Sequence, residues 1–326
     1  MLKKIILSLV DKIPFELVNL IPINFPLIPY YHVISDDELP HICNLYNYKN
    51  IKQFISDIDF IASNYKPISL LELIDCVKKG SEIKKKSFLL TFDDGYKEMY
   101  DIVAPILYKK GVPSVFFLST DFIDNRDLCY QNKASLIIDV LKKNHSQLKR
   151  LTEHKAWFFR MNQDEIIKNI LTVDYKKRHF LDKLANYLGI DFTEFIKTYQ
   201  PYLSRQQIKS MIEDGFYFGA HSKDHPKYCE ISMNEQIIQT LESLKFMRQE
   251  FSLPYSIFAF PYGTRVDSIE FLLKIRSHVD LTFCTSDFRR DIVPWNLQRI
   301  NFERSLLPAE KILARYKVKS LIYRIC

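Results

Sequence analysis

Seven short apolar runs, separated by segments with helical patterns, most constrain the fold of this chain of 326 residues. Most of the runs lack strict alternation of apolar and polar residues, as expected for strands that are covered on both faces. Alternating strands and helices predict a mainly parallel sheet. Seven strands therefore predict an α/β fold, a distorted (β/α)7 barrel with imperfect closure. The predicted strands are residues 27–33, 87–93, 114–119, 216–221, 256–261, 280–285 and 297–302.

Helix start and stop signals lie between these runs. Three serines are each followed three residues later by Glu or Gln, which is the spacing of a capping box. The pairs are Ser69 with Glu72, Ser204 with Gln207, and Ser232 with Glu235. Gly80 and Gly215 stand where the first two of these helices should end.

A polar stretch interrupts the alternation at about residues 126–203. It has helical patterns near residues 134–143, 164–171 and 176–188, so we expect a helical insertion, in a position to cover the site. We expect this insertion to belong to a barrel of residues 26–326, which follows an apolar segment of residues 1–25.

The two ends of the chain are apolar and basic. The first apolar run stops after six residues at Asp11 and Lys12, no small-residue cleavage site follows, and a membrane span needs about 20 apolar residues. The six cysteines form no CxxC pair, which argues against a thiolate zinc site and suits a reducing compartment. We therefore expect a cytoplasmic protein that is able to contact a membrane peripherally through either end. For residues 312–325, a helix that covers the barrel is the alternative.

The net charge of +7 comes mostly from scattered Lys and Arg side chains. No basic run is interleaved with aromatic residues in the manner of a nucleic-acid motif. We therefore expect a solvated basic surface and no nucleic-acid partner. The sequence indicates no particular oligomeric state.

Two adjacent carboxylates follow the second predicted strand, in Thr91-Phe92-Asp93-Asp94-Gly95. Neighbouring side chains on a strand point to opposite faces, so Asp93 and Asp94 can share a site only if the strand ends there, and Gly95 permits that break. One carboxylate can then bind a metal while the other takes a proton. A loop pair that caps the next helix is the alternative.

Two histidines end the fourth predicted strand, in His221-Ser222-Lys223-Asp224-His225-Pro226. Pro226 disfavours helix at His225, which favours a loop that brings both imidazoles to one ion. Together with Asp94 they would make a set of two histidines and one carboxylate, with positions left open for water and substrate. A structural role is the alternative for each histidine.

A third pattern, Phe258-Ala259-Phe260-Pro261-Tyr262-Gly263, ends the fifth predicted strand. Pro261 has no backbone N–H, so the Tyr262 N–H is the nearest free donor, and Gly263 allows a sharp turn. Such a donor could stabilise a developing oxyanion. A simple turn is the alternative.

In this order, the three patterns resemble the motifs of the NodB-homology polysaccharide deacetylases, carbohydrate esterase family 4. Residues 91–95 match the family's TFDDG motif, residues 221–226 match H-[ST]-x-x-H-P, and residues 261–263 match the end of its third motif. The resemblance covers roughly residues 26–302, apart from the poorly matched insertion.

The resemblance implies a role for each matched position. Asp93 would be the catalytic base, and the metal ligands would be Asp94, His221 and His225. Ser222 would brace the histidine loop through hydrogen bonds, and Tyr262 would supply the oxyanion donor through its backbone N–H.

The chain departs from the family pattern at two points. Many members have an Arg in the third motif that pairs with the base, where this chain has Ala259. Arg299 is a candidate substitute, and a structural salt bridge is the alternative. The late Leu-x-His motif, which provides the acidic histidine, is absent, and the last histidine, His278, lies in a helical pattern.

His32 is the candidate general acid. It ends the first predicted strand in Tyr30-Tyr31-His32, a position that resembles the poly-N-acetylglucosamine deacetylase branch. That branch is circularly permuted, with its acidic histidine near the N-terminus, and often has F-x-[FY]-P-Y-G as its third motif. A packed core histidine is the alternative.

The resemblance implies a hydrolase of non-peptide C–N bonds, which removes the N-acetyl group of an N-acetylated sugar or polysaccharide and releases acetate. The ligand types suit Zn²⁺ best, and Co²⁺, Ni²⁺, Mn²⁺ or Fe²⁺ would also fit. One alternative is a hydrolase of an O-acetyl ester or a non-sugar amide on the same scaffold. The other is an inactive carbohydrate-binding protein, which the presence of Asp93 and all three candidate ligands disfavours.

Overall fold

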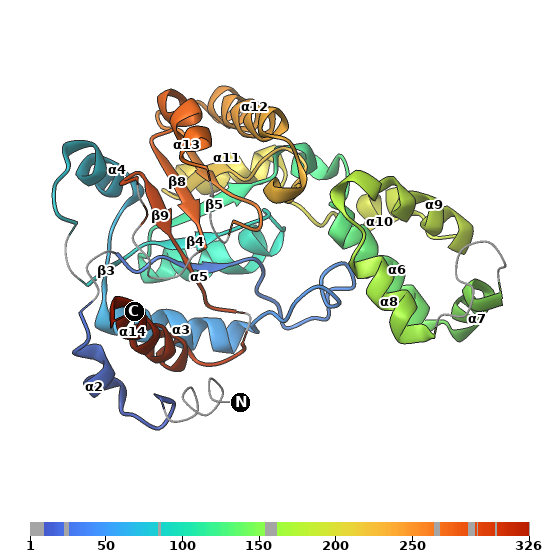
Figure 1. The fold of residues 1–326 in the computed structure, drawn as a ribbon, viewed down its shortest axis with the longest axis horizontal. Coiled ribbons are helices and arrows are strands. Elements are labelled where there is room, and N and C mark those ends of the chain that lie inside the picture. Colours follow the sequence, from blue (N-terminus) through green and yellow to red (C-terminus); the bar gives the residue numbers. More distant parts are fainter. Residues whose placement is uncertain are drawn as a thin grey trace.

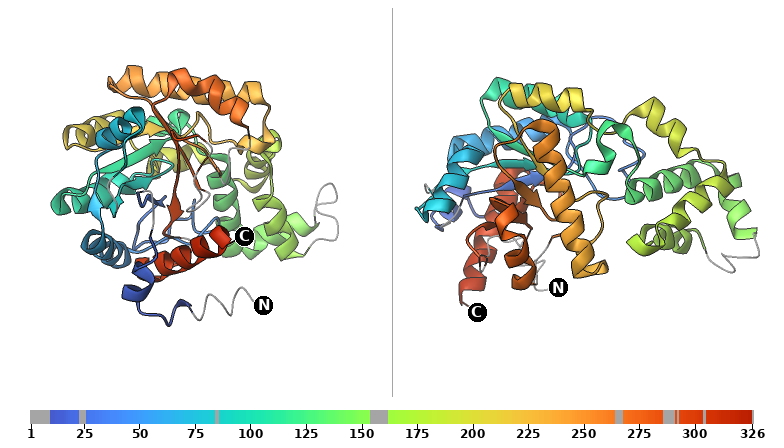
Figure 2. Two further views of the ribbon diagram at one scale, coloured as in Figure 1. Left: turned by 60° about the vertical axis from the view of Figure 1, so that its left-hand side comes forward. Right: turned by 90° about the horizontal axis from the view of Figure 1, so that it is seen from above.

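The computed structural model describes residues 10–22, 26–83, 86–153, 162–263, 268–285, 291, 293–303 and 305–325. One large sheet lies among helices, and a group of helices projects from one side of it (Figure 1). Viewed from another direction, helices surround the strands on several sides (Figure 2).

The large sheet is parallel throughout and has the strand order β10-β1-β4-β5-β6-β7-β8-β9. Its strands are β1 (Pro29–Tyr31), β4 (Leu90–Phe92), β5 (Ser114–Leu118), β6 (Tyr217–Ala220), β7 (Ile257–Ala259), β8 (Leu281–Cys284), β9 (Asn296–Gln298) and β10 (Ile300–Asn301). A small parallel pair consists of β2 (Lys66–Pro67) and β3 (Ser87–Phe88).

The run of residues 296–301 joins the two edges of the large sheet. β9 and β10 are separated only by Arg299, whose N–H donates to the Cys284 carbonyl of β8 at 2.8 Å. The next N–H, of Ile300, donates to the Ile28 carbonyl beside β1 at 2.9 Å. Eight strand segments therefore occupy seven strand positions. The predicted α/β fold, a barrel with imperfect closure, is confirmed.

Most of the remaining helices connect or follow the barrel strands. They are α3 (Ile51–Asn64), α4 (Leu70–Lys79), η1 (Met99–Val103), α5 (Ala104–Lys110), η2 (Thr120–Asn125), α11 (Arg205–Glu213), η4 (Tyr228–Glu230), α12 (Met233–Phe251), α13 (Ile269–Ile275), η5 (Arg276–His278) and α14 (Ala309–Ile325). All three predicted capping boxes are present, at the starts of α4, α11 and α12. Gly80 ends α4 with φ 62°, and Gly215, with φ 92°, follows the C-cap of α11.

Aromatic side chains join neighbouring strands to the helices outside them. Phe92, Phe116 and Phe218 occupy one level of β4, β5 and β6, with stacked ring centroids 5.0 and 5.4 Å apart. Phe54 of α3 meets Phe92 edge-on at 6.0 Å. The apolar runs of the sequence are thus covered on both faces, which explains why they do not alternate.

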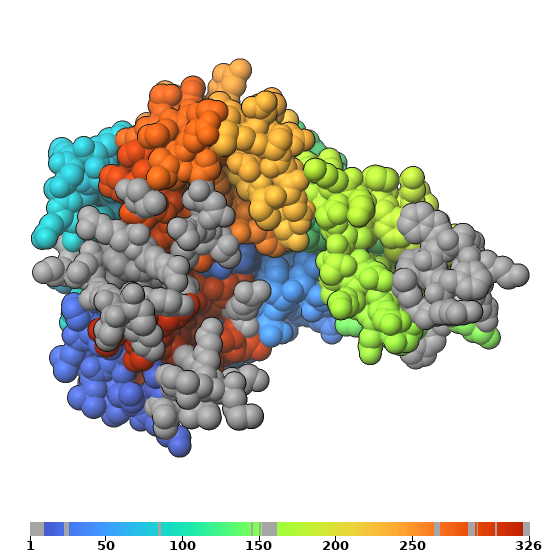
Figure 3. All heavy atoms as spheres, viewed as in Figure 1, coloured from blue at the N-terminus to red at the C-terminus, as the bar shows by residue number. Residues whose placement is uncertain are grey.

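The helical insertion lies between β5 and β6. It contains α6 (Tyr130–Lys143), α7 (His145–Glu153), α8 (Gln163–Leu171), η3 (Tyr175–Lys177), α9 (His179–Leu188) and α10 (Phe192–Tyr199). The three predicted helical patterns correspond to α6, α8 and the stretch from η3 to α9, whereas α7 and α10 were not predicted. These helices share a hydrophobic core of their own, which Val33, Tyr96 and Tyr202 of the barrel loops complete. Figure 3 shows the insertion as a lobe beside the barrel.

The described part of the N-terminal segment forms the short helix α2 (Phe15–Asn19), which packs along α14. Residues 1–9 of the predicted apolar segment lie outside the described residues. Within the described ranges, no helix has the length and apolar character that crossing a membrane requires.

Candidate metal centre and active site

β4 delivers two adjacent carboxylates at its carboxyl end. The Asp93 N–H still donates to the Tyr31 carbonyl of β1 at 3.0 Å, whereas Asp94 and Gly95 turn into the left-handed region with φ 72° and 74°. A Cβ on Gly95 would lie 2.6 Å from a Leu118 methyl carbon, so this position needs glycine for space as well as for its φ. The strand thus ends between the two carboxylates.

β6 delivers two histidines at the same end of the barrel. The His221 N–H donates to the Leu118 carbonyl at 2.8 Å and extends the pairing with β5. Ser222 and His225 then take left-handed φ values of 67° and 62°. The buried Ser222 hydroxyl accepts the His225 N–H at 3.1 Å and so closes the loop.

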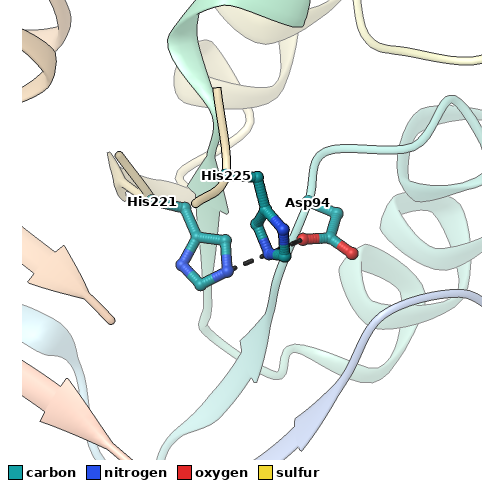
Figure 4. Close-up of side chains that lie close together, drawn as sticks. All are labelled: Asp94, His221 and His225. Carbon is teal, nitrogen blue, oxygen red and sulfur yellow. Dashed lines mark ion pairs between the residues drawn. The ribbon is translucent and has the colours of Figure 1, made fainter. Parts of the chain in front are cut away.

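Asp94, His221 and His225 converge from these two strand ends (Figure 4). Asp94 Oδ1 lies 3.6 Å from His221 Nε2 and 3.3 Å from His225 Nε2. Among the described residues, this buried Oδ1 atom has no hydrogen-bond partner. A carboxylate oxygen and two imidazole nitrogens that face one another are a suitable donor set for a divalent cation, so these residues fit a metal.

The protonation of the three side chains reflects their proximity. Burial raises the pKa of Asp94, but the nearby histidines outweigh it and hold that pKa well below its usual value. Burial lowers the pKa of His225, but the Asp94 carboxylate outweighs it and raises that pKa to about 10. Burial, together with the charge of His225, lowers the pKa of His221 to about 4. A metal would therefore displace a proton from His225.

The two histidines differ in what supports their second ring nitrogen. His221 Nδ1 lies 2.8 Å from the Ala259 carbonyl oxygen, which orients the ring with Nε2 toward Asp94. His225 Nδ1 is buried and has no hydrogen-bond partner within the described residues, although the Cys129 thiol raises the pKa of this ring. Cys129 precedes α6, so the insertion reaches one of the candidate metal ligands.

Asp93 forms a bidentate ion pair with Arg299, with N–O distances of 2.6 and 2.7 Å. Both side chains are buried, and the guanidinium also lies over the Tyr30 and Phe117 rings. Burial raises the pKa of Asp93, but the charges of Arg299 and His221 bring it below its usual value. Arg299 thus pairs with the candidate base, and Ala259 supports a candidate ligand instead.

His32 pairs with Glu303, a residue that sequence reasoning missed. The two side chains form a short ion pair, and Glu303 Oε2 also accepts a hydrogen bond from the backbone N–H of His32 at 2.8 Å. Burial lowers the pKa of His32, but the buried Glu303 carboxylate outweighs it and raises that pKa to about 9. Glu303 follows β10 as Asp93 follows β4, and this position after a strand was the available signal.

Tyr262 turns the chain beyond β7 with φ 51°, and its side chain is half exposed. Its ring centroid lies 5.2 Å from that of His225. The Gly263 N–H donates to the Phe260 carbonyl at 3.1 Å, whereas the Tyr262 N–H has no acceptor within the described part of the chain. The N–H therefore remains available to a ligand near His225.

Several uncharged polar groups near these residues are buried without a hydrogen-bond partner in the described structure: the Tyr46 and Tyr130 hydroxyls and Gln131 Nε2. The Tyr46 ring lies 5.0 Å from the His32 ring, and Gln131 lies close enough to the Tyr262 hydroxyl to influence its pKa. No motif marks these three residues in the sequence. They offer donors and acceptors to a polar ligand.

A second group of potential ligands lies at the surface and consists of Glu38, Cys43 and Asp139. Glu38 is exposed, and the other two are partly exposed. Acidic groups often gather at a surface without an ion, so this group indicates no site.

Sequence comparison matches the model of the family described as polysaccharide deacetylase to residues 80–278. This range contains the three motifs, whereas His32, Arg299 and Glu303 lie outside it. A curated relative, the poly-beta-1,6-N-acetyl-D-glucosamine N-deacetylase of Escherichia coli (strain K12), is 32% identical over 62 residues, and its counterpart in Escherichia coli O157:H7 matches equally. The match covers 19% of this chain and only 9% of each relative.

Two solved structures share the fold over most of both chains. One is the Streptococcus pyogenes deacetylase PplD in complex with acetate, with a TM-score of 0.56 and 16% identity over 90% of this chain and 99% of that one. The other is IcaB from Ammonifex degensii, with a TM-score of 0.55 and 15% identity over 90% and 97%. At these identities the likeness establishes the fold alone.

Proposed function

Because this chain belongs to the polysaccharide deacetylase family, we propose that it is a metal-dependent hydrolase of the N-acetyl group of an N-acetylated sugar or polysaccharide. The convergence of Asp94, His221 and His225 beside the Arg299-paired Asp93 carries this proposal. A divalent cation, when bound by these three ligands, polarises the amide carbonyl and lowers the pKa of water. Zinc suits the ligand types best, and Co²⁺, Ni²⁺, Mn²⁺ and Fe²⁺ are the alternatives.

Two side chains would move the protons. Asp93 is held ionised by Arg299 and accepts a proton from the attacking water, whose oxygen joins the acetyl carbon. His32 is held protonated by Glu303 and donates a proton to the sugar nitrogen as the C–N bond breaks. The products are acetate and a free amino sugar. The different surroundings of the two side chains would thus keep Asp93 ionised as a base and His32 protonated as an acid within one site.

Backbone and polar side chains would hold the substrate. The free Tyr262 N–H suits the developing oxyanion, because a donor without a competing acceptor can meet the charge as it forms. The buried hydroxyl of Tyr46 and the amide of Gln131 suit sugar hydroxyl and acetamido groups. These available donors and acceptors support a saccharide substrate for the site.

Acetate release from a panel of N-acetylated saccharides, together with metal analysis of the purified protein, tests the proposal. We expect acetate release that a chelator abolishes and that added Zn²⁺ or Co²⁺ restores. The panel should include O-acetylated sugars and non-sugar amides, because the same site could act on them. Stoichiometric metal with no acetate from any substrate would contradict the proposal, and saccharide binding without turnover would indicate an inactive sugar-binding protein.

A further inference from the structure

The N-terminal segment exposes apolar side chains in a row. Ile13, Leu17 and Leu20 are 38%, 60% and 77% exposed. Leu17 lies on α2, and Ile13 and Leu20 flank the two ends of this helix. In the same segment the side chains of Val10, Phe15 and Val18 are buried. The segment thus buries one set of apolar side chains against the barrel and leaves a second set exposed.

α14 fixes the orientation of this segment. Arg315 forms a bidentate ion pair with Asp11, and the Lys311 ammonium donates to the Asp11 carbonyl. At the other end of α2, the Lys317 ammonium donates to the Ile21 carbonyl at 3.0 Å. These contacts at both ends of α2 hold the exposed row of leucine and isoleucine outward.

The sequence of the two segments that pack together here is basic. Residues 1–22 and 309–325 together contain eight Lys or Arg and three Asp or Glu, so these two segments carry +5 of the net charge of +7. Lys12 beside the row is exposed, and the exposed Lys86 lies close enough to Lys317 to contribute to its lowered pKa. Residues 1–9, which precede the row, are themselves apolar with two lysines, Lys3 and Lys4.

We propose that Ile13, Leu17 and Leu20 form a docking surface for an anionic lipid bilayer, into whose headgroup region they insert while exposed cations, such as Lys12 and Lys86, contact the lipid phosphates. Apolar insertion and attraction to anionic headgroups together are the ordinary basis of peripheral attachment. An exposed apolar row on a well-anchored element otherwise faces water at a cost. This proposal does not depend on the proposed catalytic function.

The docking surface lies away from the candidate active site. α2 precedes β1, and its Phe15 packs against Phe60 near the end of α3, with ring centroids 4.8 Å apart. α3 runs back from the carboxyl ends of the parallel strands to their amino ends, so α2 lies toward the amino ends. The bound bilayer therefore leaves the strand ends that carry His221 and Asp94 open to substrate.

The test is sedimentation of the full chain with vesicles of phosphatidylcholine alone and of phosphatidylcholine mixed with phosphatidylglycerol. We expect binding to the mixed vesicles that weakens with added salt. The double variant Leu17→Glu/Leu20→Glu should lower the partition coefficient about tenfold or more. Leu273→Glu is the matched control, because Leu273 of α13 is 57% exposed and lies on another side of the barrel, and it should bind as the wild type does.

Any of four outcomes would overturn the proposal. The first is a wild type that does not sediment with either vesicle, and the second is a double variant that binds as well as the control. The third is binding that the double variant retains but that removal of residues 1–9 abolishes, which would assign it to that segment alone. The fourth is a double variant that loses a dimer in light scattering while its vesicle binding is unchanged, which would make a second copy the occupant. Equal thermal unfolding midpoints for the variants establish that each is folded.

Discussion

The barrel and the helical insertion contribute different kinds of group to the candidate site. The barrel supplies charged groups at its strand ends, and each is held by another charge, as in Asp93 with Arg299 and His32 with Glu303. The insertion supplies uncharged groups, and Tyr130 and Gln131 each bury an atom without a hydrogen-bond partner in the described structure. The first region thus holds its charged groups in fixed pairs, whereas the second leaves buried polar atoms that suit a polar ligand.

Such a scaffold can keep the groups for chemistry apart from the groups for substrate recognition. Strand ends are fixed by the barrel, so charged groups placed there keep their spacing. Helices that insert between strands can change without moving those ends. We therefore expect barrel variants to change kcat or metal content and insertion variants to change KM.

Loss of a metal ligand should give the largest effect. Asp94→Asn removes the carboxylate that faces both histidines, so we expect loss of bound metal and a fall in kcat/KM of more than about 1,000-fold. Elemental analysis measures the bound metal, and acetate release measures kcat/KM. Metal bound at the wild-type level with normal turnover would show that Asp94 is not a metal ligand.

Loss of the candidate base should give the next largest effect. Asp93→Asn keeps the shape of the side chain but cannot take a proton, so kcat should fall about 100- to 10,000-fold while metal remains bound. The same measurements apply, with Asp101→Asn on η1 as a surface control. Normal turnover in Asp93→Asn would require another base.

Loss of the Glu303 carboxylate should move the pH profile. The proposed acid must be protonated, so activity should fall as pH rises through the pKa of His32, about 9 when Glu303 is present. Glu303→Gln removes the charge that raises this pKa, so the alkaline limb should move toward the ordinary value of 6.5. The pH dependence of kcat/KM measures the shift. An unmoved limb would separate His32 from the titrating group.

The same pair should also contribute to folding stability in a defined pH range. Since the folded-state pKa of His32 is raised, its contribution is complete below about pH 6.5 and is lost as pH rises through about 9. The free energies of unfolding of the wild type and Glu303→Gln, measured with denaturant, should therefore differ most near pH 6.5 and approach each other as pH rises through about 9.

A change in the insertion should give the smallest effect. Gln131→Ala removes an amide but leaves the barrel charges in place, so KM should rise by about three- to tenfold with little change in kcat or metal content. The exposed Gln206→Ala on α11 is the control. A large loss of kcat in Gln131→Ala would break the division between the two regions.

Much of the barrel was predictable because its strands have a strong signal. The strands of the large sheet are short and mostly buried, so the seven apolar runs fall at the observed strand positions. In the insertion, α6, α8 and α9 each bury one face in the second core, which the periodicity reveals. α10 buries no residue fully, and its apolar side chains are mostly half-buried, so its pattern was not recognised.

The site was predictable where neighbouring residues carry the signal together. Asp93 and Asp94, or His221 and His225, lie within five residues of each other. Glu303 stands alone among 39 acidic residues, and only the pairing of β1 with β10 brings it to His32. Tyr46 lies in a loop and Gln131 lies 85 positions later in α6, and no local rule links the two residues. The sequence also did not determine whether Arg299 pairs with Asp93, because the two residues meet only when the run of residues 296–301 closes the barrel.

The strand that closes the barrel has a consequence for how the protein acquires activity during synthesis. Arg299 lies within this strand, between β9 and β10, and Glu303 follows its end and meets a histidine 271 positions earlier in the chain. A nascent chain that lacks residues 296–303 already contains all three candidate ligands, yet neither proton-transfer residue has its partner. During synthesis the three candidate ligands are therefore present before residues 296–303, whereas Asp93 and His32 gain the charged partners that shift their pKa values only when this last strand docks.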